Sequence, residues 1–260
     1  MPTEEEFLAC NRTDRMSKEK IAYKSLPHQS EKSKAEQQRT FEMLNEQTDA
    51  YARGQISDNQ NTILHGPPGV GKTHIGLLSM AYALGQGLTC ISTALLCERA
   101  LLLGGMHYHK LIKMPANNNR TQNIHALADI CIQRFKRDPV LISFVRSLDL
   151  LFFDDFFQIS GQQGCILDMV LRWVKRSEAY MGGVRIIGTA DIEQLGTIEG
   201  IPMLMSANII CSYTIVDLQF YVRCRDDIYS QQLCELCRHT ILNEIQEKEF
   251  IHLITTHCNG

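Results

Sequence analysis

The stretch Gly66-Pro67-Pro68-Gly69-Val70-Gly71-Lys72-Thr73 decides the fold that this sequence predicts. It fits the pattern G-x-x-x-x-G-K-[ST], and it lies between a short apolar run, 62–64, and a helical pattern over 75–84. The glycines let successive N–H groups point at phosphate oxygens, and the helix that follows adds its positive N-terminal end. We expect Lys72 to reach the β- and γ-phosphates and the Thr73 hydroxyl to bind Mg²⁺. The context therefore predicts a nucleoside triphosphate site, and a chance glycine-rich turn is the alternative.

A pair of aspartates at the end of an apolar run is the second landmark. Residues 148–153 have the composition of a buried strand, and Asp154 and Asp155 follow directly. In an open parallel sheet, the carboxyl end of such a strand lies beside the phosphate loop. We expect Asp154 to orient water on Mg²⁺ and Asp155 to position the attacking water. A buried strand that ends in an acidic turn is the alternative, but two landmarks in the right order favour the catalytic interpretation.

The rest of the chain alternates between the two hydrophobic periods. Short apolar runs typical of strands occur at 88–91, 184–188 and 208–218, and helical periodicity occurs at 94–103, 124–136 and 166–174. This alternation predicts an α/β fold with a mostly parallel, twisted sheet that helices cover on both faces.

The N-terminal segment differs from the rest in composition. Residues 1–39 are polar, with charges of both signs interleaved, so we expect a flexible or partly helical leader. From residue 40, apolar positions recur at helical spacing and predict a helix that ends before Gly54. The expected division is a leader over 1–39, a nucleotide-binding domain over 40–210 and the beginning of a second domain over 211–260.

Composition and charge set few limits on partners. With 44% hydrophobic and 21% charged residues, the 260-residue chain can form one good core and part of a second. Because the net charge is -3, any contact with nucleic acid must come from a local groove. The N-terminus is acidic and no apolar run approaches membrane-spanning length, so we expect neither a signal peptide nor a membrane partner.

The ten cysteines are scattered, which is typical of a reducing compartment. Cys234 and Cys237, with Cys224 upstream and His239 just after, have part of the spacing of a zinc site. The second ligand pair that would complete a tetrahedral site at known spacing is missing, and the pair lies within a helical pattern. Half-buried helix thiols are the favoured interpretation, and zinc is the alternative.

A basic and aromatic segment follows the second helical pattern. Residues 106–110 are expected to form a loop that carries His107, His109 and Lys110. Such side chains on a loop can hold a nucleic-acid strand through phosphate contacts and base stacking. A polar surface loop without any ligand has the same appearance.

Together these motifs resemble the Pif-one-type DNA helicases, the RecD-like group of superfamily 1B, and particularly the helicase segment of Helitron-type transposons. The resemblance spans about residues 40 to 240. Leu44-Asn45-Glu46-Gln47 resembles the glutamine motif of the family, which assigns Gln47 to the adenine. The run 104–111 resembles the first strand-gripping motif, which assigns His107, His109 and Lys110 to single-stranded DNA.

Two further runs resemble the third and fourth motifs of that family. The run 182–195 contains Gln194, which by resemblance couples the nucleotide state to DNA. The run 218–223 ends in Arg223, which by resemblance approaches the γ-phosphate from the second lobe.

The resemblance implies a RecA-like P-loop NTPase that uses ATP and Mg²⁺, acts on single-stranded DNA or DNA junctions, and works as a monomer. ATP would sit between two RecA-like lobes, and its hydrolysis would advance the gripped strand. The expected function is therefore an ATP-dependent DNA helicase. Work on genomic DNA would place it in the nucleus.

The sequence departs from the family pattern in two ways. The family has Asp-Glu where Asp154-Asp155 stands here, and a carboxylate displaced by about 1 Å costs on the order of a hundredfold in rate. The sequence ends at Gly260, soon after the fourth motif, so we expect a truncated second lobe. A non-catalytic, nucleotide-dependent DNA-binding or assembly module is the first alternative. An AAA-type loader ATPase is the second, and Gln194 and Arg223 argue against it.

Overall fold

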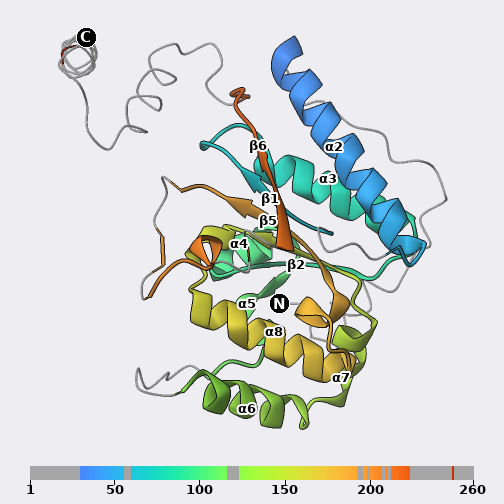
Figure 1. Ribbon diagram of the computed structural model, residues 1–260, viewed down its shortest axis with the longest axis vertical. Coiled ribbons are helices and arrows are strands. Elements are labelled where there is room, and N and C mark those ends of the chain that lie inside the picture. The colour runs from blue at the N-terminus through green and yellow to red at the C-terminus, as the bar shows by residue number, and fades with distance from the viewer. Residues whose placement is uncertain are drawn as a thin grey trace.

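A six-stranded parallel sheet organises the molecule (Figure 1). The computed structural model describes residues 30–55, 60–115, 123–192, 196–197, 200–206, 209, 212–222 and 248. Within them, the strand order is β3-β2-β4-β5-β1-β6, and every neighbouring pair runs parallel. The strands are β1 (Asn61–His65), β2 (Cys90–Ala94), β3 (Met106–His107), β4 (Leu150–Asp154), β5 (Arg185–Ala190) and β6 (Tyr213–Asp217). The predicted α/β fold is confirmed.

Helices cover both faces of this sheet (Figure 1). One face carries α2 (Glu31–Ala52) and α3 (Lys72–Gly85), and the other carries α6 (Ile124–Phe135), α7 (Pro139–Ser147) and α8 (Gly161–Lys175). The short helices are α4 (Cys97–Leu102) and α5 (Tyr108–Leu111), and the 3-10 turns are η1 (Phe156–Gln158), η2 (Tyr180–Gly183) and η3 (Met203–Met205).

Each face of the sheet has its own hydrophobic core. Phe152 packs in the cluster with α2 and α3, whereas its neighbour Phe153 packs in the larger cluster with α6, α7 and α8. Successive side chains of a strand point to opposite faces, so a strand covered on both sides buries both sets of side chains. In β4 these side chains are apolar up to Asp154, which is why this strand is visible in the sequence as a continuous apolar run.

The strand order brings the two sequence landmarks to one edge of the sheet. β5 lies between β1, which leads into the phosphate loop, and β4, which ends in Asp154. Helix α3 also crosses close to β4, because Gly76 of α3 faces the ring of Phe152 and a Cβ there would lie 2.2 Å from Cε2. The phosphate loop and the aspartates therefore share the carboxyl edge of the sheet.

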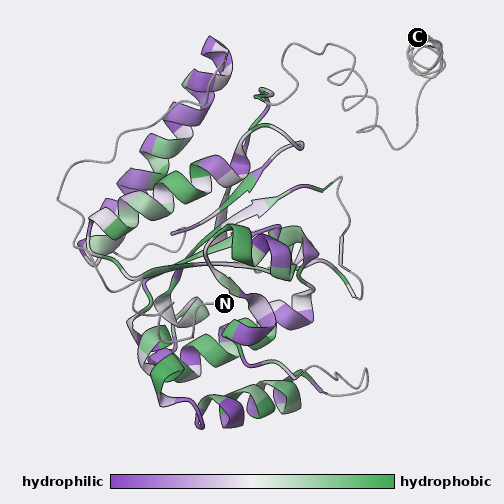
Figure 2. Cartoon of the chain, turned by 180° about the vertical axis from the view of Figure 1, so that it is seen from behind, coloured by the Kyte–Doolittle hydropathy of each residue, from purple (hydrophilic) through white to green (hydrophobic). Residues whose placement is uncertain are grey.

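Helix α2 begins well before residue 40, where the sequence predicts its start. Ser30 caps it by accepting a hydrogen bond from the Ser33 backbone N at 3.2 Å. The buried face of the first turns is polar and consists of Ser33, Gln37 and Thr40, and the helix is hydrophilic over most of its length (Figure 2). Because the buried side chains of these first turns are polar, the sequence shows no helical period of apolar residues there. The hydrophobic pattern therefore did not indicate where α2 begins.

The sequence predicts that a second domain begins at residue 211. In the structure, β6 pairs with β1 from Tyr213 to Asp217 and is the edge strand of the described sheet. Helix α7 was not predicted; Asp138 caps it and Pro139 occupies its first turn. Among the described residues, no helix is long and apolar enough to span a membrane.

Candidate functional site

The phosphate loop connects β1 to α3 in the conformation that its glycines permit. Gly69 and Gly71 have φ of 88° and 93°, in the left-handed region that glycine adopts without strain. Gly71 is also the N-cap of α3 and brings no capping side chain to the N–H groups of the first turn. An uncapped helix N-terminus behind a glycine-rich turn favours an anion.

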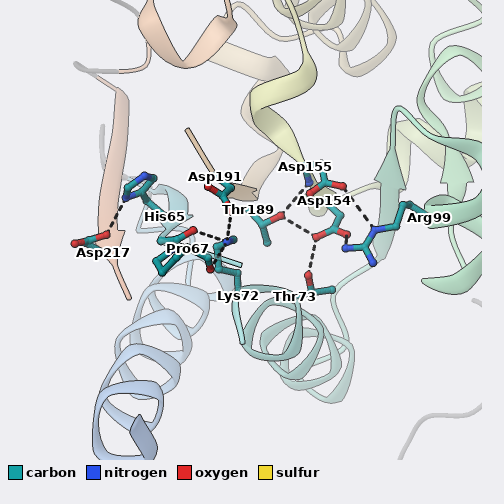
Figure 3. A network of polar contacts seen from close by, with 11 residues as sticks. His65, Pro67, Lys72, Thr73, Arg99, Asp154, Asp155, Thr189, Asp191 and Asp217 are labelled. Atoms are coloured by element: carbon teal, nitrogen blue, oxygen red, sulfur yellow. Dashed lines mark hydrogen bonds and ion pairs between the residues drawn. The ribbon is translucent and has the colours of Figure 1, made fainter. Parts of the chain in front are cut away.

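Lys72 lies against the loop that precedes it (Figure 3). Its Nζ donates hydrogen bonds to the backbone oxygens of Gly66 and Pro67 and lies 3.5 Å from Oδ2 of Asp191. Burial lowers the pKa of the ammonium group, and the Asp191 carboxylate opposes that shift. The loop thus carries a poorly hydrated cation at the place where a phosphate would bind.

Asp154 is fully buried and bound by three side-chain donors (Figure 3). Its Oδ1 accepts from the hydroxyls of Thr73, at 2.9 Å, and Thr189, at 2.8 Å. Its Oδ2 accepts from Nη2 of Arg99 at 2.6 Å. The structure therefore brings together Thr73 and Asp154, the two residues that the sequence predicts to hold Mg²⁺. A hydroxyl and a carboxylate are the hard oxygen donors that this ion prefers.

Asp155 follows in a left-handed conformation, with φ of 55°. Its backbone N donates to the Thr189 hydroxyl at 2.9 Å, and its Oδ2 lies 3.6 Å from Nε of Arg99. Burial, and then the charge of Asp154, raise the pKa of the Asp155 carboxyl, while Arg99 and Lys72 oppose the shift. A carboxylate with a raised pKa beside the phosphate loop is suited to accept a proton from water.

Arg99 escaped the sequence-based prediction, whereas Thr189 and Asp191 lie in the run 182–195, in which only Gln194 was given a role of its own. Thr189 and Asp191 stand at and just beyond the carboxyl end of β5, between the phosphate loop and Asp154. Once β5 is placed between β1 and β4, its end is where polar side chains would be sought. Arg99 lies on α4 within a helical pattern, and nothing local distinguishes it from a surface arginine.

Two glutamines of α2 differ in what they contact. Gln47, the residue assigned to the adenine, accepts hydrogen bonds from the Thr62 hydroxyl at 2.9 Å and from Nη2 of the buried Arg185 at 2.8 Å. Both donors stand at the amino ends of their strands, away from the phosphate loop. Gln37 instead donates from Nε2 to the Val70 backbone oxygen at 2.6 Å. The structure therefore places Gln37, not Gln47, against the loop.

The chain that leaves β6 also contacts the phosphate loop. The backbone N of Val222 donates to the Gly69 oxygen at 2.9 Å. One turn of α2 joins the same segment, because the Glu36 carboxylate accepts from the backbone N of Gln219 at 3.0 Å and of Phe220 at 3.2 Å. Residues 219–222 thus lie against the loop and α2 together.

The segment 106–110, predicted as a loop, is in fact β3 followed by α5. Tyr108 is fully buried, and its hydroxyl donates to the Gln163 backbone oxygen at 2.7 Å. His107 forms a 2.7 Å hydrogen bond from Nε2 to the Leu95 oxygen, and its ring lies 5.2 Å from that of His109. Burial, then the neighbouring His107, lower the pKa of His109. Lys110 is exposed, so the two histidines are parts of a packed edge and the lysine faces solvent.

Some of the predicted site residues lie outside the described residues. These are Gln194 and Arg223, which were expected to report on the nucleotide, and the cysteines and histidine of the alternative zinc site, Cys224, Cys234, Cys237 and His239. Within the part of the chain that the structure describes, no three His, Cys, Asp or Glu side chains form a metal-binding group.

Solved structures that resemble this one include Pif1 helicases. The Candida albicans Pif1 helicase matches 78% of this chain and 46% of its own, with a TM-score of 0.62 and 16% identity. The Bacteroides Pif1 helicase in complex with ADP-AlF3 and ssDNA matches 76% of this chain and 47% of its own, with a TM-score of 0.57 and 20% identity. This chain has a Pif1-like helicase fold.

At these identities the likeness shows the Pif1-like fold alone. No protein-family model matches the sequence, and no curated protein matches it. The chain spans about half the length of the Pif1 structures that it matches. The Pif1-like fold nevertheless agrees with the resemblance in the sequence, which rests on motifs and not on overall identity.

Proposed function

We propose that this chain binds ATP with Mg²⁺ at the phosphate loop and acts as a Pif1-type, ATP-dependent DNA helicase. The observation that carries the proposal is the 2.9 Å hydrogen bond between the Thr73 hydroxyl and Asp154, at the start of the helix that follows the loop. It joins two motifs that lie 81 residues apart in the sequence. Thr73, Asp154 and the loop fit the magnesium–nucleotide pair in donor chemistry and in order along the chain.

Each residue of the site has a distinct task in this proposal. Lys72, which donates to the carbonyls of Gly66 and Pro67, would bind β- and γ-phosphate oxygens in their place, and the uncapped N–H groups of α3 would bind the same phosphates. Thr73 and Asp154 would hold Mg²⁺, which would neutralise charge on the phosphates. Asp155 accepts a proton from the attacking water, and its raised pKa favours this.

Recognition of the adenine base requires a polar side chain beside the phosphate loop. We assign the adenine contact to Gln37, because it is the glutamine whose side chain lies against the loop. Gln194 and Arg223 keep the roles that the resemblance implies, as reporter of the γ-phosphate and as cation from a second lobe. Single-stranded DNA or a DNA junction is the proposed partner, with His107, His109 and Lys110 at one edge of its path, and the nucleus is the proposed location.

A second candidate function is a nucleotide-dependent DNA-binding module without turnover. Asp155 favours this alternative, because its side chain is one methylene shorter than the glutamate of the family motif and lies 3.6 Å from the Arg99 guanidinium. A carboxylate held by a cation is a weaker base than a free one. Turnover of ATP decides between the two candidates.

The test is ATP hydrolysis by the purified chain with and without single-stranded DNA, alongside Lys72→Ala. Lys34→Ala is the matched control, since its ammonium pairs with Glu31 at 4.0 Å and its side chain is 43% exposed. DNA-stimulated turnover that is lost in Lys72→Ala and kept in Lys34→Ala supports the helicase. Tight, Lys72-dependent ATP binding without turnover supports the binding module. Failure to bind ATP refutes both.

A further inference from the structure

Arg99 is the one cation of α4 that points at the metal-binding carboxylate (Figure 3). Of the two Asp154 oxygens, Oδ1 is taken by the hydroxyls of Thr73 and Thr189, and Oδ2 is taken by Nη2 of Arg99 at 2.6 Å. Nε of the same guanidinium lies 3.6 Å from Oδ2 of Asp155. Arg99 therefore holds the carboxylate oxygen that the two threonine hydroxyls leave for an ion.

A divalent cation and the guanidinium exclude each other at this oxygen. Both are positively charged, and both need the same lone pairs of a carboxylate that is fully buried. Charge balance works in the same direction. Lys72 and Arg99 face the carboxylates of Asp154, Asp155 and Asp191, and the guanidinium is the counter-charge for the pair Asp154 and Asp155.

Arg99 can leave without opening the core. Its side chain is 41% exposed, whereas that of Asp154 is 0% exposed, so the guanidinium reaches the carboxylate from the solvent side. The helix that carries it has only six residues, and its last two side chains, Leu101 and Leu102, are exposed. Rotation of the arginine side chain is enough to free Asp154.

We propose that Arg99 is a gate on the divalent-cation site: it holds Asp154 and Asp155 in the nucleotide-free protein and must be displaced before Mg²⁺ binds. The inference rests on the proposed function, because it takes Asp154 as the metal ligand. In this proposal Arg99 is a positioning residue. Its guanidinium prevents a free cation from occupying the site, and Asp155 can act only after that guanidinium has been displaced.

Binding of Mn²⁺ alone to the nucleotide-free chain tests the gate, with free Mn²⁺ measured by electron paramagnetic resonance. Mn²⁺ has the oxygen preference of Mg²⁺. If Arg99 covers the site about nine-tenths of the time, Arg99→Met tightens Mn²⁺ binding about tenfold. Arg99→Lys, a point charge that cannot span both aspartates, should also bind Mn²⁺ more tightly than the wild type. Asp154→Asn should remove the site.

Arg172→Met is the matched control, because Arg172 pairs with Asp168 at 2.9 Å and its side chain is 36% exposed, on α8. Its Mn²⁺ affinity should equal that of the wild type. Equal affinity in wild type, Arg99→Met and Arg99→Lys would overturn the gate. If Mn²⁺ affinity is equal in all three proteins but Mg²⁺ and a fluorescent ATP analogue still bind together, the gate fails while the proposed function stands. If the analogue binds to none of the proteins, the proposed function itself fails.

Discussion

Gly76 is a point of close contact between α3, the helix that follows the phosphate loop, and β4, the strand that ends in Asp154. An added methyl group at Gly76 should therefore disturb the position of both elements. A Cβ at residue 76 would lie 2.2 Å from Cε2 and 2.7 Å from Cζ of Phe152, whose side chain is fully buried. Ordinary van der Waals contact begins at 3.4 Å. Gly76→Ala must therefore move α3 away from β4 by about 1 Å or push the ring off its rotamer.

The magnitude follows from two opposed effects. Overpacking of this kind costs about 1–3 kcal/mol, and alanine in place of glycine within a helix recovers up to about 1 kcal/mol. We expect a net loss of about 1–2 kcal/mol in the free energy of unfolding. Thr73 stands one turn before Gly76, so its 2.9 Å hydrogen bond to Asp154 should be stretched as well. A misplacement of about 1 Å at such a site costs on the order of a hundredfold in rate.

Urea unfolding gives the stability change, and ATP hydrolysis and binding give the functional one. Gly161→Ala is the control, because a Cβ there meets only the Ile201 oxygen at 3.7 Å. It should leave stability equal or raised. Phe152→Leu combined with Gly76→Ala should recover part of the loss, since it removes the ring atoms in conflict. If Gly76→Ala unfolds like the wild type and binds ATP equally well, the close packing of α3 on β4 is refuted.

Three further outcomes are expected. Gln37→Ala should weaken ATP binding by about tenfold, which corresponds to the loss of one good hydrogen bond. Gln47→Ala should lower stability but keep ATP affinity. Isothermal titration calorimetry measures both affinities, and a loss of affinity in Gln47→Ala but not in Gln37→Ala would reverse our assignment. Ser30→Ala should lower stability by about 0.5–2 kcal/mol in thermal melts, and no change would mean that α2 does not begin there. Burial raises the pKa of Tyr51 to about 12, so the stability from its neutral phenol is complete below pH 10 and is lost as pH rises from about 10 to 12. Tyr51→Phe should show a shallower alkaline decline in unfolding free energy over that range, and an unchanged slope would contradict this.

The central strands and the phosphate loop could be predicted because their signals are local. An apolar run such as 150–153 indicates a strand covered on both faces, and the phosphate loop needs glycines at fixed spacing. The strand order follows less directly from the sequence, and the structure supplies it: β5 pairs with β4, the strand that ends in Asp154.

The features that escaped prediction depend on contacts between distant residues. Arg99 reaches across 55 residues to Asp154, and Gln37 reaches across 33 residues to Val70. Neither side chain differs from a surface residue in its own neighbourhood of sequence. The segment 106–110 was wrongly predicted as a loop because its composition is mostly polar. Its Tyr108 is nevertheless fully buried, which the local sequence does not indicate.

The contact of residues 219–222 with the phosphate loop has a mechanical consequence. The Gly69 oxygen holds the Val222 backbone, and Glu36 and Gln37, adjacent on α2, hold the departing chain and the loop respectively. Backbone hydrogen bonds and a stiff helix transmit displacement over short distances. The phosphate loop, α2 and residues 219–222 are therefore mechanically linked. A change in the shape of the loop would therefore act directly on residues 219–222, through hydrogen bonds and not through side-chain packing alone.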